Sequence, residues 1–168
     1  SAFWKDIADG LRRRMSDWDA LNDLLCRFFR SFDEKDWKMM RSCLGDRVWT
    51  DYSSFRDAPP GEISGDRYVL QREVALSLLD MQHNFLNLRV EITGTSARSW
   101  CNYIIHRFHP DFDGQNDAFF HSYGRYEFGF LRANEEWRIS SIHQMLVRNH
   151  GDPEIHGATR QADNTRDV

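Results

Sequence analysis

One histidine and one distant aspartate are the side chains of this sequence best suited to acid–base chemistry. His83 lies in the stretch 81–87, where a helical apolar pattern ends and a strand-like pattern begins, and Asp33 closes an earlier helical stretch. An imidazole with a pKa of about 6.5 gains and loses a proton near neutral pH. A carboxylate beside it fixes the tautomer and stabilises the imidazolium that forms. We therefore predict that Asp33 and His83 form a base dyad inside an apolar pocket.

The helix that carries Asp33 is indicated by apolar residues three and four positions apart. Asp33 follows them in phase with Phe29, at the C-terminal end of the helix, where a carboxylate opposes the helix dipole. A residue that breaks a local rule in this way can mark a functional site, and the alternative is that Asp33 caps the next helix. The apolar stripe consists of Trp18, Leu21, Leu24, Leu25, Phe28, Phe29 and Phe32.

Further elements flank this helix on both sides. A shorter helix is predicted over residues 3–14. Ser16 is predicted to be the N-cap that begins the main helix, with Asp17 and Asp19 as acidic residues in its first turn. The helix that follows has Trp37, Met40 and Leu44 on its buried face and ends at Gly45. Downstream, the pattern predicts a strand over 48–52, a loop at 57–61, a helix from 65, strands over 83–93, 97–109, 119–131 and 137–147, a polar loop at 110–117 and a C-terminal tail.

This order of elements predicts an α+β fold with one domain, residues 1–150, followed by residues 151–168 as a tail or an arm over a neighbouring subunit. We expect a cone-shaped, strongly curved mixed or antiparallel sheet, wrapped by the N-terminal helices around a pocket. Aromatic residues make up 14% of the 168 residues, so some of them must line a core, a cavity or an interface. Trp100, Tyr103 and Phe128 are expected on the exposed face of the sheet, which suggests a homo-oligomer.

Composition and motifs argue against several classes of function. The net charge of -4 gives no nucleic-acid footprint, and no apolar run approaches the roughly 20 residues of a membrane span. The N-terminus has no apolar core of a signal peptide, which predicts a cytoplasmic protein. The three cysteines are scattered and are expected to be free thiols. The seven histidines form no HxH or HExxH motif, and no phosphate loop or dinucleotide fingerprint is present, so neither a metal nor a cofactor is expected.

Four segments carry a resemblance to a known family. They are Phe32-Asp33-Glu34-Lys35-Asp36-Trp37, Thr50-Asp51-Tyr52-Ser53-Ser54-Phe55, Gln82-His83, and Gly124-Arg125-Tyr126 leading to Trp137-Arg138-Ile139. With the order of elements, they make residues 16–148 resemble the SnoaL-like branch of the nuclear transport factor 2-like superfamily, and within it the scytalone dehydratases. The resemblance implies that Asp33 and His83 are the catalytic pair and that Tyr52 holds a water or a substrate carbonyl. Relatives form dimers or trimers, and the likeness to the dehydratases favours a homotrimer.

The sequence departs from the dehydratase pattern at several recognition positions. Phe32 stands where the pattern has a tyrosine, and Gly124 and Tyr126 stand where it has a serine and an asparagine. Its second histidine has two candidates here, His106 and His109, which point to opposite faces of a strand. His106 is the slight preference, since His109 precedes a proline at the strand end. We therefore expect the base dyad with an altered set of groups that polarise the substrate.

These observations predict a cofactor-independent lyase, of the dehydratase type, that acts on a small hydrophobic cyclic or aromatic hydroxy or keto compound. A ketone isomerase or a polyketide cyclase would use the same dyad. Two non-catalytic alternatives share the fold: a ligand-binding protein, and the small subunit of an aromatic-ring dioxygenase. The catalytic residues are predicted to be His83, Asp33 and Tyr52, and the substrate-binding residues His106, Tyr126, Phe28, Phe55 and Asn87.

Overall fold

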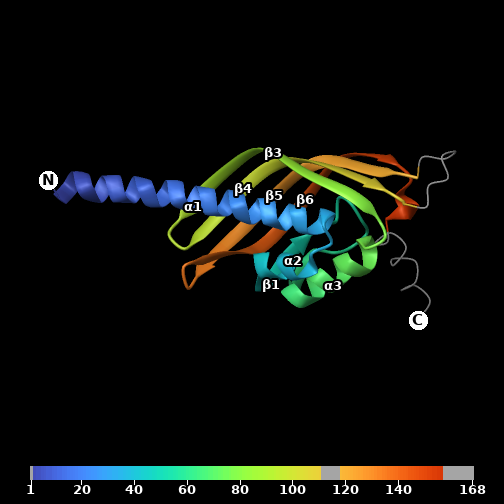
Figure 1. The fold of residues 1–168 in the computed structure, drawn as a ribbon, viewed down its shortest axis with the longest axis horizontal. Helices are drawn as coiled ribbons and strands as arrows, with labels where there is room; N and C mark the ends of the chain where they lie inside the picture. The colour runs from blue at the N-terminus through green and yellow to red at the C-terminus, as the bar shows by residue number, and fades with distance from the viewer. Residues whose placement is uncertain (1, 111–117, 157–168) are drawn as a thin grey trace.

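The computed structural model describes residues 2–110 and 118–156, and in this part of the chain helices cover one face of a single sheet (Figure 1). The strand order is β2-β1-β6-β5-β4-β3. The helices are α1 (Ala2–Asp33), α2 (Trp37–Cys43) and α3 (Gly65–Leu76), with a short 3₁₀ helix η1 (Pro153–Ile155) near the end. The strands are β1 (Leu44–Asp51), β2 (Gly61–Ser64), β3 (Asp80–Thr93), β4 (Ser96–Phe108), β5 (Phe120–Ala133) and β6 (Glu136–Gly151).

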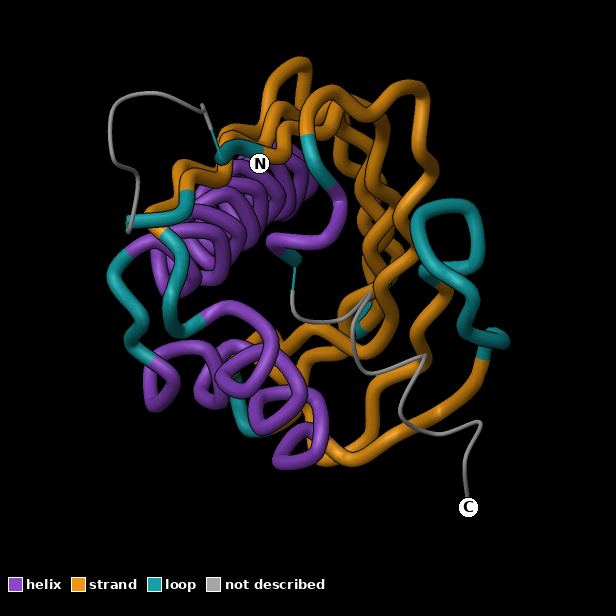
Figure 2. The backbone as a smooth tube through the Cα atoms, turned by 90° about the vertical axis from the view of Figure 1, so that its right-hand side faces the viewer, coloured by secondary structure: helices purple, strands orange, loops and turns teal. Residues whose placement is uncertain are grey.

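The sheet is mixed and strongly curved. β3 to β6 form an antiparallel meander, and β1 joins it through parallel pairing with β6, where Thr50 lies opposite Ile142. Figure 2 shows the strands curving around the helices, so that the inner face of the sheet and the helices enclose the core. The predicted α+β cone is therefore confirmed. The short strand β2, which pairs with β1, was missed and begins at the last residue of the predicted loop.

Helix α1 is one continuous helix of 32 residues, so the prediction of two helices separated at Ser16 is wrong. The adjacent Asp17 does not act as a first-turn acid. Its Oδ1 accepts hydrogen bonds from Arg132 Nη1 at 2.8 Å and from Trp137 Nε1 at 3.1 Å, both on the β5–β6 hairpin. Polar residues in the middle of a helix need no break when a distant partner satisfies them.

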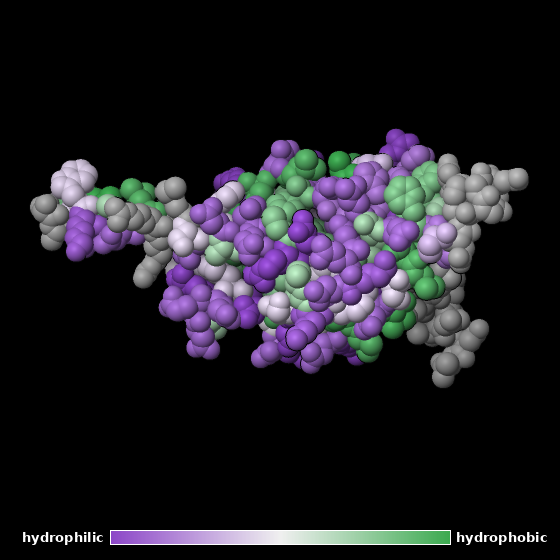
Figure 3. All heavy atoms as spheres, viewed as in Figure 1, coloured by the Kyte–Doolittle hydropathy of each residue, from purple (hydrophilic) through white to green (hydrophobic). Residues whose placement is uncertain are grey.

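The N-terminal end of α1 projects beyond the sheet (Figure 1). Its apolar side chains Phe3, Trp4 and Leu11 are exposed, and hydrophobic residues are visible on this projection in Figure 3. Tyr103 and Phe128, by contrast, are buried on the inner face of the sheet. The expectation that these two lie on the exposed face is therefore wrong. Among residues 2–110 and 118–156, no helix has the length and hydropathy that a bilayer crossing requires.

The turn from α1 to α2 fixes the position of Asp33. Lys35 adopts a φ of 54°, the amide of Asp36 bonds the carbonyl of Ser31, and the amide of Lys35 bonds the carbonyl of Phe32. This is the pattern of a Schellman C-cap, with lysine at the position usually taken by glycine. Asp36 then caps α2 by accepting from the amide of Met39. Capping is thus performed by Asp36, which leaves the carboxylate of Asp33 available for another partner.

Two boundaries differ from the prediction. Helix α2 ends at Cys43, so Leu44 and Gly45 already belong to β1 instead of closing the helix. At the C-terminus, β6 runs to Gly151, beyond the predicted domain end, and Ile155 and His156 are buried against the domain. The start of the predicted tail is therefore part of the folded unit. The predicted loop at 110–117 and the rest of the tail lie largely outside the described residues.

Candidate active site

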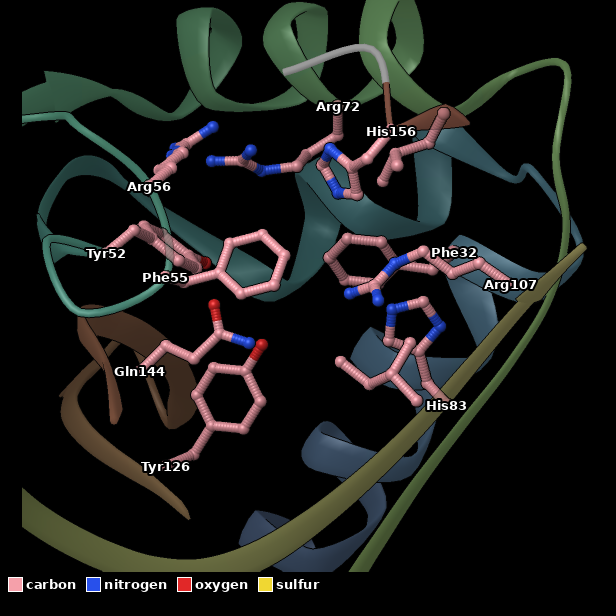
Figure 4. A pocket seen from close by; sticks show the side chains of 12 residues that line it. Phe32, Tyr52, Phe55, Arg56, Arg72, His83, Arg107, Tyr126, Gln144 and His156 are labelled. Carbon is pink, nitrogen blue, oxygen red and sulfur yellow. The ribbon is translucent and has the colours of Figure 1, made fainter. Parts of the chain in front are cut away.

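A pocket opens between the inner face of the sheet, α3 and the C-terminal end of α1 (Figure 4). The space between its side chains amounts to about 350 Å³, including the part open to solvent. The lining residues are Phe32, Tyr52, Phe55, Arg56, Arg72, Leu76, His83, Ile105, Arg107, Tyr126, Gln144 and His156.

His83 and Asp33 meet at one side of this pocket. The ring nitrogen Nδ1 of His83 lies 2.7 Å from Oδ1 of Asp33, and the backbone amide of His83 lies 3.0 Å from both carboxylate oxygens. One carboxylate at the end of α1 therefore holds both the backbone and the ring of a residue near the start of β3. A carboxylate only accepts hydrogen bonds, so we assign the ring proton to Nδ1. The lone pair is then on Nε2, the nitrogen turned away from Asp33.

The surroundings of His83 favour its neutral form. Its side chain is 3% exposed, and the ring of Phe32 stacks on it at a centroid distance of 4.5 Å. Burial lowers the pKa of His83 below its ordinary value, the hydrogen bond to Asp33 opposes this, and the positive charge of Arg107 adds to the lowering. A buried neutral imidazole with a fixed tautomer has the properties of a general base. Phe32, a departure from the dehydratase pattern, supplies the apolar wall beside it.

Three other predicted residues line the same pocket. Tyr52 follows β1 directly, and its hydroxyl lies 2.6 Å from the hydroxyl of Tyr68 on α3. Phe55 belongs to the loop after β1, and Tyr126 projects from the inner face of β5. Burial raises the pKa values of Tyr52 and Tyr126 well above the ordinary value, so both hydroxyls remain protonated hydrogen-bond donors.

Gly124 explains why the dehydratase pattern cannot be followed on β5. A Cβ atom at this position would lie 2.2 Å from the carbonyl oxygen of Met145 and 2.7 Å from the ring of Tyr103. The ring of Tyr103 packs against Tyr126 at a centroid distance of 4.7 Å. The space that a polar side chain would need is therefore filled by Tyr103.

The other three predicted substrate-binding residues lie elsewhere. Phe28 is buried in the core among aromatic rings and is not part of the pocket lining. His106 points to the outer face of β4, where it contacts the ring of His121, and His109 does not line the pocket either. Asn87 is exposed, with a φ of 56°, at an irregularity between Leu86 and Arg89. This bulge breaks the alternation that was used to place Asn87 on the same face as His83.

The expectation of an apolar pocket is wrong, because three arginine side chains line it (Figure 4). Arg56, Arg72 and Arg107 point into it together with His156, and no acidic side chain is among its described lining residues. Burial lowers the pKa values of Arg56 and Arg107 to about 10 in each case, which still leaves both charged at neutral pH. The same effect places the pKa of His156 well below its ordinary value.

Sequence reasoning missed these cationic residues, although the sequence held a signal for two of them. Arg107 alternates with Tyr103 and Ile105 along β4, and all three point inward. Arg72 lies four positions after Tyr68 and four positions before Leu76, so it lies on the buried face of α3. Within the described ranges, no group of three or more His, Cys, Asp or Glu side chains is placed to hold a metal ion.

Comparison with known proteins gives the family. The model of the SnoaL-like domain matches residues 13–143. Among curated proteins, no sequence matches the chain significantly.

Solved structures share the fold at low sequence identity. The Kfla4162 protein from Kribbella flavida superposes with a TM-score of 0.77 at 18% identity, over 82% of this chain and 95% of that protein. A proposed scytalone dehydratase from Novosphingobium aromaticivorans gives 0.70 at 10% identity, over 83% and 89%. A type 3 hexachlorocyclohexane dehydrochlorinase from Novosphingobium barchaimii gives 0.67 at 16% identity, over 85% and 94%. The chain therefore belongs to the SnoaL-like family of the nuclear transport factor 2-like superfamily, as the resemblance in its sequence indicated.

Proposed function

We propose that this protein is a cofactor-independent lyase of the dehydratase type, with His83 as the general base. The observation that carries the proposal is the 2.7 Å hydrogen bond between His83 Nδ1 and Asp33, with the other ring nitrogen left to a pocket. Two of the structurally similar proteins are described by the names of a dehydratase and a dehydrochlorinase, both of which are elimination enzymes.

The proposed reaction uses the dyad twice. Nε2 of His83 takes a proton from a carbon next to a carbonyl group, and the electron pair of the broken C–H bond moves to the carbonyl oxygen as an enolate. Asp33 stabilises the imidazolium that results. The enolate then collapses to a carbon–carbon double bond, hydroxide leaves from the neighbouring carbon, and His83 returns its proton to that hydroxide. One water is lost, and the enzyme ends in its starting state.

The remaining lining can stabilise the negative charge of the enolate. The protonated hydroxyls of Tyr52 and Tyr126 and the side-chain amide of Gln144 are hydrogen-bond donors on the pocket wall. Donors that are already in place when charge develops contribute strongly to catalysis in a site that excludes water. Phe32 and Phe55 exclude water from two sides. The same dyad could return the proton to a different carbon, so product analysis decides between a lyase and a ketone isomerase.

A substrate screen with two matched histidine variants tests the proposal. Small cyclic hydroxy-ketones are incubated with the wild type, with His83→Asn and with His106→Asn, and loss of water is followed by mass spectrometry. We expect His83→Asn to lower the rate by about 10²–10⁴-fold, the usual contribution of a general base. His106→Asn changes the outer face of the sheet and should keep the wild-type rate. Turnover that survives His83→Asn would remove His83 from the mechanism. A wild type without turnover would leave a binding protein or a subunit of a larger enzyme as the explanation.

A further inference from the structure

The three pocket arginines carry charge that the described part of the protein does not neutralise. Arg72 is 5% exposed and Arg107 is 3% exposed. Within residues 2–110 and 118–156, neither they nor Arg56 forms an ion pair with a carboxylate. Uncompensated buried charge is costly for a folded protein, so such a cluster calls for a counter-charge.

Among the residues that the structure describes, several nitrogen atoms of these arginines also find no hydrogen-bond partner. The buried atoms without a partner include Nε of all three, and Nη2 of Arg72 as well. The guanidinium carbons of Arg56 and Arg72 each lie 4.8 Å from the ring centroid of Tyr52, which holds the two like charges close together. Arg107 is anchored through Nη1 to the carbonyl of Phe120 and to the hydroxyl of Ser122. The guanidinium groups are thus held in place while some of their donors remain available.

We propose that the substrate carries an oxyanion group, a carboxylate or a phosphate, which the guanidinium groups of Arg56, Arg72 and Arg107 bind. Planar guanidinium donors suit both groups because two parallel N–H bonds can reach two oxygen atoms. Figure 4 shows Arg56 and Arg72 at one end of the pocket and Arg107 on the side of His83. An anion held between them presents the adjacent carbon atoms to Nε2 of His83. That the bound anion is a substrate rests on the proposed lyase function. The binding of the anion does not depend on turnover.

The experiment compares probes of similar shape and different charge. Isothermal titration calorimetry measures the affinity of the wild-type protein for benzoate, phenyl phosphate and the neutral benzamide. We expect at least one of the two anions to bind about tenfold or more tightly than benzamide, since charge-assisted hydrogen bonds are about twice as strong as neutral ones. The anion that binds more tightly identifies the oxyanion group. Equal affinities for the anions and for benzamide would overturn the proposal, and this comparison needs no variant.

Arginine variants locate the site. Arg56→Gln and Arg107→Gln should each weaken the preferred anion about tenfold or more and leave benzamide unchanged. Arg67→Gln is the matched control, because Arg67 is exposed on the same helix as Arg72 and should bind like the wild type. Anion affinity that is the same in Arg56→Gln, in Arg107→Gln and in the wild type would overturn the assignment to this pocket.

Two measurements on the wild-type protein, anion binding and turnover, separate this inference from the proposed function. Anion binding without any turnover in the wild type would count against the lyase and support the anion site. Turnover of neutral compounds without any preference for anions would support the lyase and overturn the anion site.

Discussion

Two aspartates of the same helix show how similar contacts can have different consequences. Asp17 and Asp33 both lie on α1, and each carboxylate accepts hydrogen bonds from a partner far away in the sequence. Asp17 accepts from Arg132 and Trp137, which remain donors throughout the ordinary pH range. Asp33 accepts from His83, whose ring can lose and regain a proton and whose second nitrogen lines a pocket.

The two carboxylates are chemically alike, and the difference lies in whether the partner side chain can change its protonation state. Asp17 joins the middle of α1 to the β5–β6 hairpin, and its side chain is 13% exposed. It therefore helps to hold the helix against the sheet. Asp33 holds a ring that can change its protonation state. We infer that Asp17 is a structural contact and Asp33 an orienting one.

The largest expected effect belongs to Asp33→Asn. The amide still accepts from the backbone of His83 but no longer stabilises an imidazolium, so turnover of the compound found in the screen should fall by about 10²–10⁴-fold. The free energy of unfolding, measured by urea titration, should change by less than about 1 kcal/mol because the Asp33 side chain is partly exposed. Asp23→Asn, on an exposed face of the same helix, is the control and should affect neither quantity strongly. A rate within tenfold of the wild type would contradict the orienting role.

Asp17→Asn should give the opposite result. The same chemical change removes the charge that faces Arg132, and a guanidinium that is 17% exposed keeps only a neutral acceptor. We expect a loss of about 1–3 kcal/mol in the free energy of unfolding. The rate per folded molecule should stay within about twofold of the wild type. A fall in rate as large as that of Asp33→Asn, with stability unchanged, would show that the two aspartates do not divide their roles in this way.

The two aspartates also show what a sequence reveals about such a site. Apolar periodicity locates α1 and puts Asp33 at its end, and the change of period marks the start of β3 near His83. The resemblance to the scytalone dehydratases implied that these two side chains form a pair. Asp17 was read as a local first-turn acid because its partners lie more than a hundred positions away and no local pattern shows them. Tertiary contacts of this kind override local propensity.

The cationic side of the pocket was harder to foresee for a different reason. Arginine is rarely buried, so Arg72 and Arg107 are expected on the surface even where their spacing places them on a buried face. His106 was preferred on β4 as the counterpart of the second histidine of the dehydratases, whereas the alternation of the strand puts Arg107 inside. Asn87 was misplaced by a bulge that alternation cannot show. His156 was assigned to a tail because Gly and Pro precede it, and its burial depends on packing against Phe55 and Phe120.

The smallest of the expected effects is a shift in the pH dependence of kcat/KM, which should differ between the variants of the two aspartates. Because the pKa of His83 is lowered in the folded protein, kcat/KM should fall only when the pH drops below about 6.5, as the base becomes protonated. The contact with Asp33 raises that pKa, so Asp33→Asn should move the midpoint of the fall to still lower pH, while Asp17→Asn should leave it in place.

The free energy of unfolding should also depend on pH through the buried histidines. The folded pKa of His83 lies below its unfolded value of about 6.5, and His156 is shifted in the same direction. The unfolded chain therefore binds protons first as the pH falls, and the free energy of unfolding is fully present above about 6.5 and declines below it. Urea titrations at pH 7.5, 6.5 and 5.5 measure the decline, which should be less steep in His83→Asn. Two results would contradict a neutral His83 in the pocket. One is a decline of the unfolding free energy with pH that is equally steep in His83→Asn and in the wild type, and the other is a kcat/KM midpoint above about 6.5 in the wild type. Either result would remove the basis for the role of His83 as a base.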